Sequence, residues 1–243
     1  QQFFIYTGNL LRGDFGVSLK TGREVSTTIF ESFSISARLG GISVLVALTF
    51  GLILGSIAAL TRNKLPDQLI VFFTTLSVGV PSFVLGTVLL LVFSLILKWV
   101  PVWSITNQNY ILPVIALSLY PMAHVTRLTK SSMLDVLGQD YIRTARAKGV
   151  RPSLVIFKHA LRNALIPVVT YIGPLTAYSL TGSMVVETIF TIGGLGTKFV
   201  TSINNRDYPV IMGTTIFLAV LMVIMTLISD LMYSAVDPRI SFD

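Results

Sequence analysis

The stretch RLTKSSMLDVLGQDYIRTARAKGVRPSLVIFKHALR, from Arg127 to Arg162, decides the fold, because it is a strongly basic region between long apolar segments. Within it, residues 140–149 have the pattern of a short helix. Asp140 is a good N-cap, and Gly149 suits the left-handed position that ends a helix. At ~1.5 Å per residue this helix is roughly 13 Å long, too short and too charged to cross a bilayer. The sequence therefore predicts a small basic helix between two membrane spans, placed to dock against another protein, with a helix on an anionic membrane surface as the alternative.

The composition indicates a membrane protein. Of the 243 residues, 53% are apolar and 12% are charged, and the mean hydropathy is +0.78, which excludes a soluble globule with a polar surface. The net charge of +7 is compatible with nucleic-acid binding, but the basic residues lie between apolar segments, as in cytoplasmic membrane loops, so we expect no nucleic-acid partner. The absence of cysteine excludes disulfides and thiolate metal sites.

We expect an all-α polytopic protein with five transmembrane helices in a domain at 38–236. The uncharged segments place the spans at about 39–61, 68–97, 111–130, 155–186 and 208–235. The second span is longer than the ~20 residues that a bilayer needs, and Gly79 and Pro81 mark its expected kink. Ahead of the first span, residues 26–37 have the pattern of a separate amphipathic surface helix.

The first span carries small residues on one face. Ala47, Gly51, Gly55 and Ala59 recur every four residues. In a membrane such a ridge lets a second helix approach closely. We therefore expect this face to pack against another span.

The distribution of Lys and Arg predicts the topology. The basic stretch, the loop after the first span and the tail at 237–243 together carry more Lys and Arg than the opposite side, so they should be cytoplasmic. Residues 1–37 should then be external. With five spans, that orientation leads us to expect one further membrane helix ahead of residue 1.

Few residues have the pattern of a chemical site. The segment GGLGTK at 193–198 lacks the features of a nucleotide-binding loop, and His124 and His159 have no partner at metal-ligand spacing, so we expect neither a catalytic nor a metal site. The polar residues that could line a pathway, or simply form interhelical hydrogen bonds, are Ser77, Tyr120, Tyr171, Tyr178 and Ser179. Asp230 lies at apparent membrane depth, where a carboxylate needs a partner, and we expect a structural ion pair with Arg162 or Lys158.

The order of spans and basic helix resembles the membrane subunits of binding-protein-dependent ABC importers. Their signature is a cytoplasmic Glu-Ala-Ala-x3-Gly loop followed by Ile-x-Leu-Pro. Arg143, Thr144, Ala145 and Gly149 occupy the loop positions here, while HALR at 159–162 stands in place of Ile-x-Leu-Pro. The Arg for Glu replacement and the HALR segment are typical of the peptide/nickel branch.

Further motifs extend the resemblance to the first of that branch's two permease types, the oligopeptide/dipeptide permease B subunits. They are RGDFGVS at 12–18, ETIF at 187–190, GLG at 194–196, RDYPV at 206–210 and DPRI at 237–240. In that family a first span precedes the GDFG segment, in agreement with the further helix expected above.

The resemblance implies a type I importer permease in the plasma membrane of a bacterium or archaeon, forming half of a translocation pathway. It implies as partners a homologous second permease, two ATPase subunits that bind ATP and Mg, and an external peptide-binding protein, with no cofactor on this chain. The residues implied to dock on an ATPase are Asp140, Tyr141, Ile142, Arg143, Thr144, Ala145, Arg146, Ala147, Lys148 and Gly149. The alternatives are uptake of nickel chelates or another small solute, or an ion-coupled secondary transporter. The latter would favour a buried carboxylate near the midplane.

Overall fold

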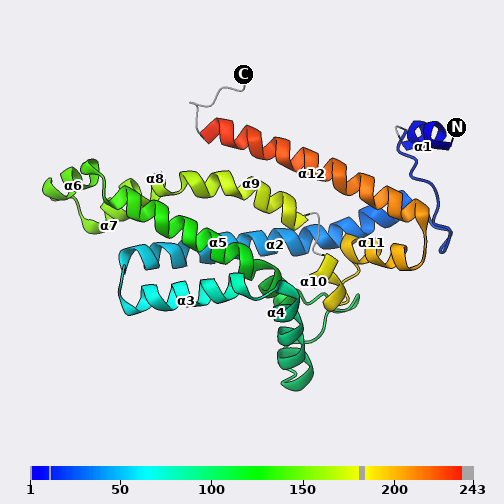
Figure 1. The fold of residues 1–243 in the computed structure, drawn as a ribbon, viewed down its shortest axis with the longest axis horizontal. Coiled ribbons are helices and arrows are strands. Elements are labelled where there is room, and N and C mark those ends of the chain that lie inside the picture. The colour runs from blue at the N-terminus through cyan, green and yellow to red at the C-terminus, as the bar shows by residue number, and fades with distance from the viewer. Residues whose placement is uncertain (1, 11, 181–183, 237–243) are drawn as a thin grey trace. The chain divides into compact units, whose positions relative to one another are not determined.

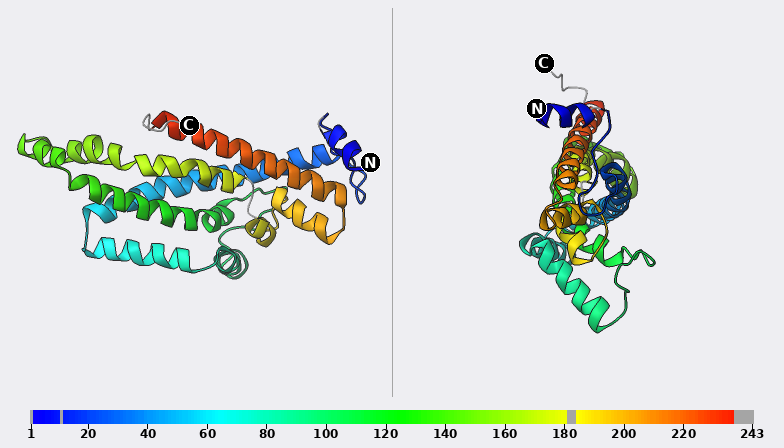
Figure 2. Two further views of the ribbon diagram at one scale, coloured as in Figure 1. Left: turned by 45° about the horizontal axis from the view of Figure 1, so that its top comes forward. Right: turned by 90° about the vertical axis from the view of Figure 1, so that its right-hand side faces the viewer.

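The computed structural model describes residues 2–10, 12–180 and 184–236, and its elements can be followed in Figure 1 and Figure 2. Within these ranges the chain is helical, with no sheet and one isolated β-bridge between Val17 and Glu24. The elements are α1 (Gln2–Leu10), α2 (Val25–Leu60), α3 (Leu65–Gly79), α4 (Ser82–Leu89), the π-helix η1 (Leu90–Ile96), α5 (Ile111–Leu137), α6 (Asp140–Ala147), α7 (Pro152–Leu154), the π-helix η2 (Val155–Leu161), α8 (Arg162–Ala164), α9 (Ile166–Leu180), α10 (Met184–Ile189), α11 (Leu195–Asn204) and α12 (Tyr208–Val236). The tail at 237–243 lies outside the described residues.

Three helices, α2, α5 and α12, are long and apolar enough to cross a membrane. The broken runs 65–96 and 152–189 raise the number to as many as five in the described part of the chain, if each counts as one span. The all-α fold class is therefore confirmed. The expected kink is also confirmed, because α3 ends at Gly79 and α4 begins at Ser82, directly after Pro81.

The helix α2 differs from the expectation at its N-terminal end. Instead of a surface helix at 26–37 followed by a new helix, α2 runs without a break for 36 residues. No proline interrupts this stretch, and Gly40 and Gly41 do not break the helix. The more polar composition of residues 26–37 therefore reflects a different environment around the N-terminal part of α2, and it does not mark a separate helix.

The described residues fall into two compact units. Unit 1 comprises residues 1–42, 83–117 and 177–225, and unit 2 comprises residues 43–82, 118–176 and 226–243. The core of unit 1 contains Val25 and Ile29 of α2 with Leu195 and Val210. Phe33 and Phe217 add an edge-to-face aromatic contact with ring centroids 5.2 Å apart.

In unit 2 the small-residue face of α2 packs against α5, as expected from the sequence. A Cβ added to Gly51 would lie 2.7 Å from Val125 Cγ1, and one added to Gly55 would lie 2.6 Å from the Thr126 carbonyl oxygen. Ala47 is fully buried on the same face. The absence of side chains at the two glycines thus allows the close helix approach.

Candidate functional site

The short basic helix α6 stands beyond the end of α5 in unit 2 (Figure 1). It is held there by Ile142, which is fully buried in an apolar cluster with Met133 of α5 and Val155, Ala160 and Ala164 of the following segment. We expected Ile142 to offer apolar contact to a partner, and that expectation is wrong. Its side chain instead anchors α6 to its own subunit.

The end of α6 is a Schellman cap, which fixes the direction in which the chain leaves the helix. Gly149 has φ +74°, as the sequence predicted. Its N–H donates to the Arg146 carbonyl oxygen at 3.0 Å, and the N–H of Val150 donates to the Ala145 carbonyl oxygen at 3.2 Å. This pair of bonds is characteristic of the motif, and the φ favours glycine.

The start of α6 differs from the expectation by one residue. Gln139 is the N-cap, with extended backbone, and Asp140 is the first helical residue. Asp140 still suits this position, because a carboxylate in the first turn favours the helix dipole. Its Oδ1 lies 3.6 Å from Arg143 Nη1, but both side chains are largely exposed, so the pair adds little to stability.

The outward face of α6 is basic and open. Arg143, Thr144, Ala147 and Lys148 are exposed there. The Thr144 hydroxyl donates to the Asp140 carbonyl oxygen at 3.0 Å. Small residues between long cations make a face that a second protein can approach closely while its acidic groups meet the cations.

Tyr141 ties α6 to the next span. It is 43% exposed, and its hydroxyl oxygen accepts a hydrogen bond from Asn163 Nδ2 at 2.9 Å. Asn163 belongs to α8 in unit 2. Together with Ile142 and the cap at Gly149, this bond attaches α6 to the helices that follow it.

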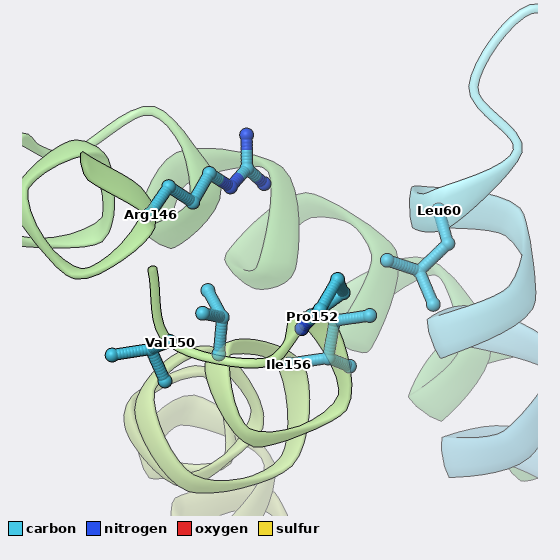
Figure 3. A pocket seen from close by; sticks show the side chains of 6 residues that line it. Leu60, Arg146, Val150, Pro152 and Ile156 are labelled. Atoms are coloured by element: carbon cyan, nitrogen blue, oxygen red, sulfur yellow. The ribbon is translucent and has the colours of Figure 1, made fainter. Parts of the chain in front are cut away.

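A hollow of about 400 Å³ opens beside α6 (Figure 3). Arg146 reaches over one side of it from α6, and Leu60 of α2 borders the opposite side. Val150, Pro152 and Ile156 line the space between them. The other arginine of α6, Arg143, does not line this hollow, so the two arginines face different surroundings.

Unit 2 contains a buried ion pair that no sequence pattern indicated. Lys130 Nζ of α5 lies 2.5 Å from Asp67 Oδ1 of α3, and Asp67 is only 4% exposed. The other oxygen of Asp67 accepts the N–H of Asn63 at 3.0 Å. This carboxylate therefore fastens the loop between α2 and α3 to α5. Asp67 and Lys130 are 63 positions apart in the sequence, and no helical periodicity relates positions at that separation.

Unit 1 contains a second buried carboxylate, Glu187, which the sequence presented only as part of the ETIF motif. Its Oε1 accepts the Ser36 hydroxyl at 2.7 Å, and its Oε2 accepts the Thr197 N–H at 3.1 Å. Ser36 Oγ also accepts the N–H of Leu195 at 2.8 Å. Glu187 and Ser36 thus satisfy the free N–H groups at the start of α11, within the GGLGTK segment.

The expected pathway residues are dispersed between the two units. Ser77 is partly buried, and its hydroxyl bonds the Phe73 carbonyl oxygen of its own helix at 2.9 Å. Tyr171 lies against His124, with ring centroids 4.6 Å apart. Tyr120 and Tyr178 are exposed by 51% and 66%. Ser179 is buried at 3%, and a Cβ on Gly40 would collide with its carbonyl oxygen, so Ser179 lines no open space in this structure.

Asp230 of α12 and Arg162 of α8 are both exposed. The ion pairs found within the described ranges do not join them. The pairing therefore stays a prediction.

A sequence profile described as "Binding-protein-dependent transport system inner membrane component" matches residues 51–242. The chain belongs to this family. It is accordingly a multi-pass inner-membrane permease component of a transport system that depends on a binding protein, and it is not itself a catalytic subunit.

Individual relatives in this family resemble the chain over nearly its whole length. The dipeptide transport system permease protein DppB of Bacillus subtilis is 47% identical, over 98% of this chain and 78% of its own length. The oligopeptide transport system permease protein OppB of Haemophilus influenzae is 40% identical, over 100% and 80%. The glutathione transport system permease protein GsiC of Escherichia coli is 41% identical, over 99% and 79%.

A solved structure supports the fold alone. A chain of the inward-facing MetNI methionine ABC transporter superposes with a TM-score of 0.68 at 16% sequence identity, over 86% of this chain and 96% of that one. The type I permease core implied by the resemblance is therefore confirmed at the level of the fold.

Proposed function

We propose that this chain is the permease subunit of an ATP-driven importer of dipeptides or oligopeptides. The observation that carries the proposal is the 47% identity, over nearly the whole chain, to a permease whose name assigns it to dipeptide transport. The relatives named for oligopeptides and glutathione are consistent with the same class, because all three names describe short peptides. In this proposal the chain forms half of the pathway, and a homologous second permease forms the other half.

The proposal assigns α6 to docking in a cleft of an ATPase subunit that binds ATP and Mg. Its support is the division of α6 into a buried face anchored by Ile142 and an outward face with Arg143, Thr144, Ala147 and Lys148. The tie from Tyr141 to Asn163 would transmit motion of α6 to the next span. A second ATPase would contact the partner permease in the same way, and an external binding protein would deliver the peptide.

The same proposal fixes the orientation. Residues 127–162 and the C-terminus would face the cytoplasm, and residues 1–37 and 187–207 the external side. The support is the excess of Lys and Arg around α6.

The two alternative functions, import of nickel chelates and ion-coupled secondary transport, are distinguished from peptide import by different measurements. An importer of nickel chelates would have the same architecture, so the ligand of the cognate binding protein separates it from a peptide importer. A secondary transporter would use an ion gradient in place of ATP. The test is uptake of a labelled dipeptide into vesicles that contain the purified complex. Uptake that needs ATP and binding protein supports the proposal, and uptake driven by a proton or sodium gradient alone refutes it.

Docking at α6 has its own test. Ala147→Trp places a large side chain on the outward face of α6, whereas Ser131→Trp places the same side chain on an exposed position of α5. Only the first should weaken co-purification of the ATPase. Equal retention of the ATPase by both variants would refute docking through this face.

A further inference from the structure

Two hollows in unit 2 adjoin each other, and we call them together the α2–η2 groove. The hollow beside α6 shown in Figure 3 shares Leu60 and Ile156 with a second hollow of about 290 Å³. The second hollow is lined by Leu52, Ile53 and Ile57 of α2 together with Phe157 and Leu161 of η2. The α2–η2 groove thus has Arg146 in its first hollow and the apolar side chains of α2 in its second.

The apolar part of the α2–η2 groove lies on a membrane-spanning helix. The helix α2 is long and apolar enough to cross a membrane, and its groove-lining residue Ile53 is 50% exposed. Opposite, Phe157 is 68% exposed and belongs to a seven-residue π-helix, a form that recurs at functional sites. In a protein of the inner membrane, these side chains meet either lipid or another apolar segment.

The charge of the groove lining favours an anionic occupant over a cationic one. The lining contains one cation, Arg146, and no carboxylate. Arg143 has Asp140 nearby, whereas Arg146 has no acidic side chain within ion-pair distance in the part of the chain that the structure describes. A guanidinium presents paired N–H groups that match a phosphate, and basic pockets beside membrane helices bind anionic headgroups.

The shape of α2 favours a lipid over a further protein helix. Close helix packing in membranes uses small residues, and the small-residue face of α2 at Gly51 and Gly55 is already occupied by α5. Apart from Ser56, the α2 side of the groove presents the large branched side chains of Leu52, Ile53 and Ile57. A flexible acyl chain can fit between such side chains without backbone contact.

We propose that the α2–η2 groove binds one anionic phospholipid, whose phosphate contacts Arg146 and whose acyl chain lies along α2 and η2. This inference rests on membrane location and groove chemistry, and it does not depend on the peptide substrate or on ATPase docking. In this proposal Arg146 binds a lipid phosphate, whereas the outward residues of α6 contact an ATPase subunit.

The experiment uses the absence of cysteine in this chain. Phe157→Cys is labelled with bimane in the groove, and Phe72→Cys, a residue 61% exposed on α3 that lines neither hollow, is the matched control. A complex that contains the unsubstituted, cysteine-free chain is treated with bimane in the same way, and its fluorescence gives the amount of label bound to partner subunits. Each labelled complex is placed in vesicles of phosphatidylglycerol and phosphatidylcholine, with brominated chains on one lipid at a time, because bromine quenches a nearby bimane.

At position 157 we expect brominated phosphatidylglycerol to be preferred about fivefold over brominated phosphatidylcholine, as one juxtamembrane cation provides. At position 72 the preference should be absent. Arg146→Gln should abolish the preference at position 157, and Arg146→Lys should keep most of it. Ile57→Phe, which adds bulk beside the label without a quenching side chain and leaves α6 unchanged, should reduce quenching by both lipids.

Three results would overturn the inference. The first is equal quenching by the two lipids at position 157. The second is a preference that survives Arg146→Gln or is equally strong at position 72. The third is protection of position 157 from both lipids, which would mean that a protein segment fills the groove, or quenching there that Ile57→Phe leaves unchanged, which would mean that lipid contacts the label elsewhere.

Discussion

Gly149→Val tests whether the direction of the chain after α6 matters for coupling. Gly149 has φ +74°, and a Cβ at this position meets no atom within 4 Å. The cost is therefore backbone strain without a steric clash, about 1–2 kcal/mol for an ordinary L-residue and more for a β-branched one. If the helix end relaxes instead, it loses the two Schellman bonds, which together contribute about 1–3 kcal/mol.

Either outcome leaves the spans in place, because the anchor of α6, Ile142, is not touched. We expect normal membrane insertion and a decrease of about 5–30-fold in ATPase affinity or in ATP hydrolysis stimulated by the loaded binding protein, the factor that 1–2 kcal/mol represents. Gly149→Asn should be milder, because asparagine tolerates the left-handed region.

The assay is a reconstituted complex in which ATPase binding, stimulated hydrolysis and peptide uptake are measured together. Gly138→Ala is the matched control, because its φ is not positive and its added Cβ would make only ordinary contacts, the nearest at 3.5 Å from the Asp135 carbonyl oxygen. Normal values of all three measurements in Gly149→Val would refute the reasoning that this glycine sets the angle of the coupling segment.

Three further predictions follow from the buried carboxylates and the topology. Glu187→Ala leaves two buried donors without a partner and should destabilise the protein by about 2–5 kcal/mol, whereas Glu187→Gln should cost less; thermal unfolding in detergent distinguishes these outcomes, and equal midpoints for both variants would contradict the reasoning. Lys130→Met should cost about 3–5 kcal/mol because it leaves the Asp67 carboxylate unpaired, and adding Asp67→Asn should recover most of the loss in the same assay. A cysteine at Ser131 should resist an impermeant thiol reagent added outside intact cells and react after permeabilisation; labelling from outside would reverse the proposed orientation.

Local patterns predicted local features well. Gly149 fits the end of a short helix because a left-handed cap is specified by a few neighbouring residues, and Gly79 with Pro81 marks a helix break for the same reason. The small residues at Gly51 and Gly55 predicted close packing correctly, although the sequence could not say that α5 would be the neighbour.

Features that depend on distant residues were missed or misassigned. Ile142 read as a docking residue because the sequence of α6 does not say which face is covered by Met133 and Val155. The contact between Glu187 and Ser36 joins positions 151 residues apart, and no periodicity connects them. The helix α2 continued through residue 37 because a change from polar to apolar composition records a change of surroundings and does not break a helix.

The division of α6 into two faces has a consequence for the divergence of transporters. Because Ile142 alone of its side chains is fully buried, the identity of Arg143, Thr144 and Ala147 can change with little effect on the fold. If α6 docks on the ATPase as proposed, gene duplication followed by substitutions at these three positions, matched by changes in the ATPase, would give two importers in one cell that no longer exchange ATPase subunits. Recognition between subunits can thus evolve independently of the stability of the subunit that carries it.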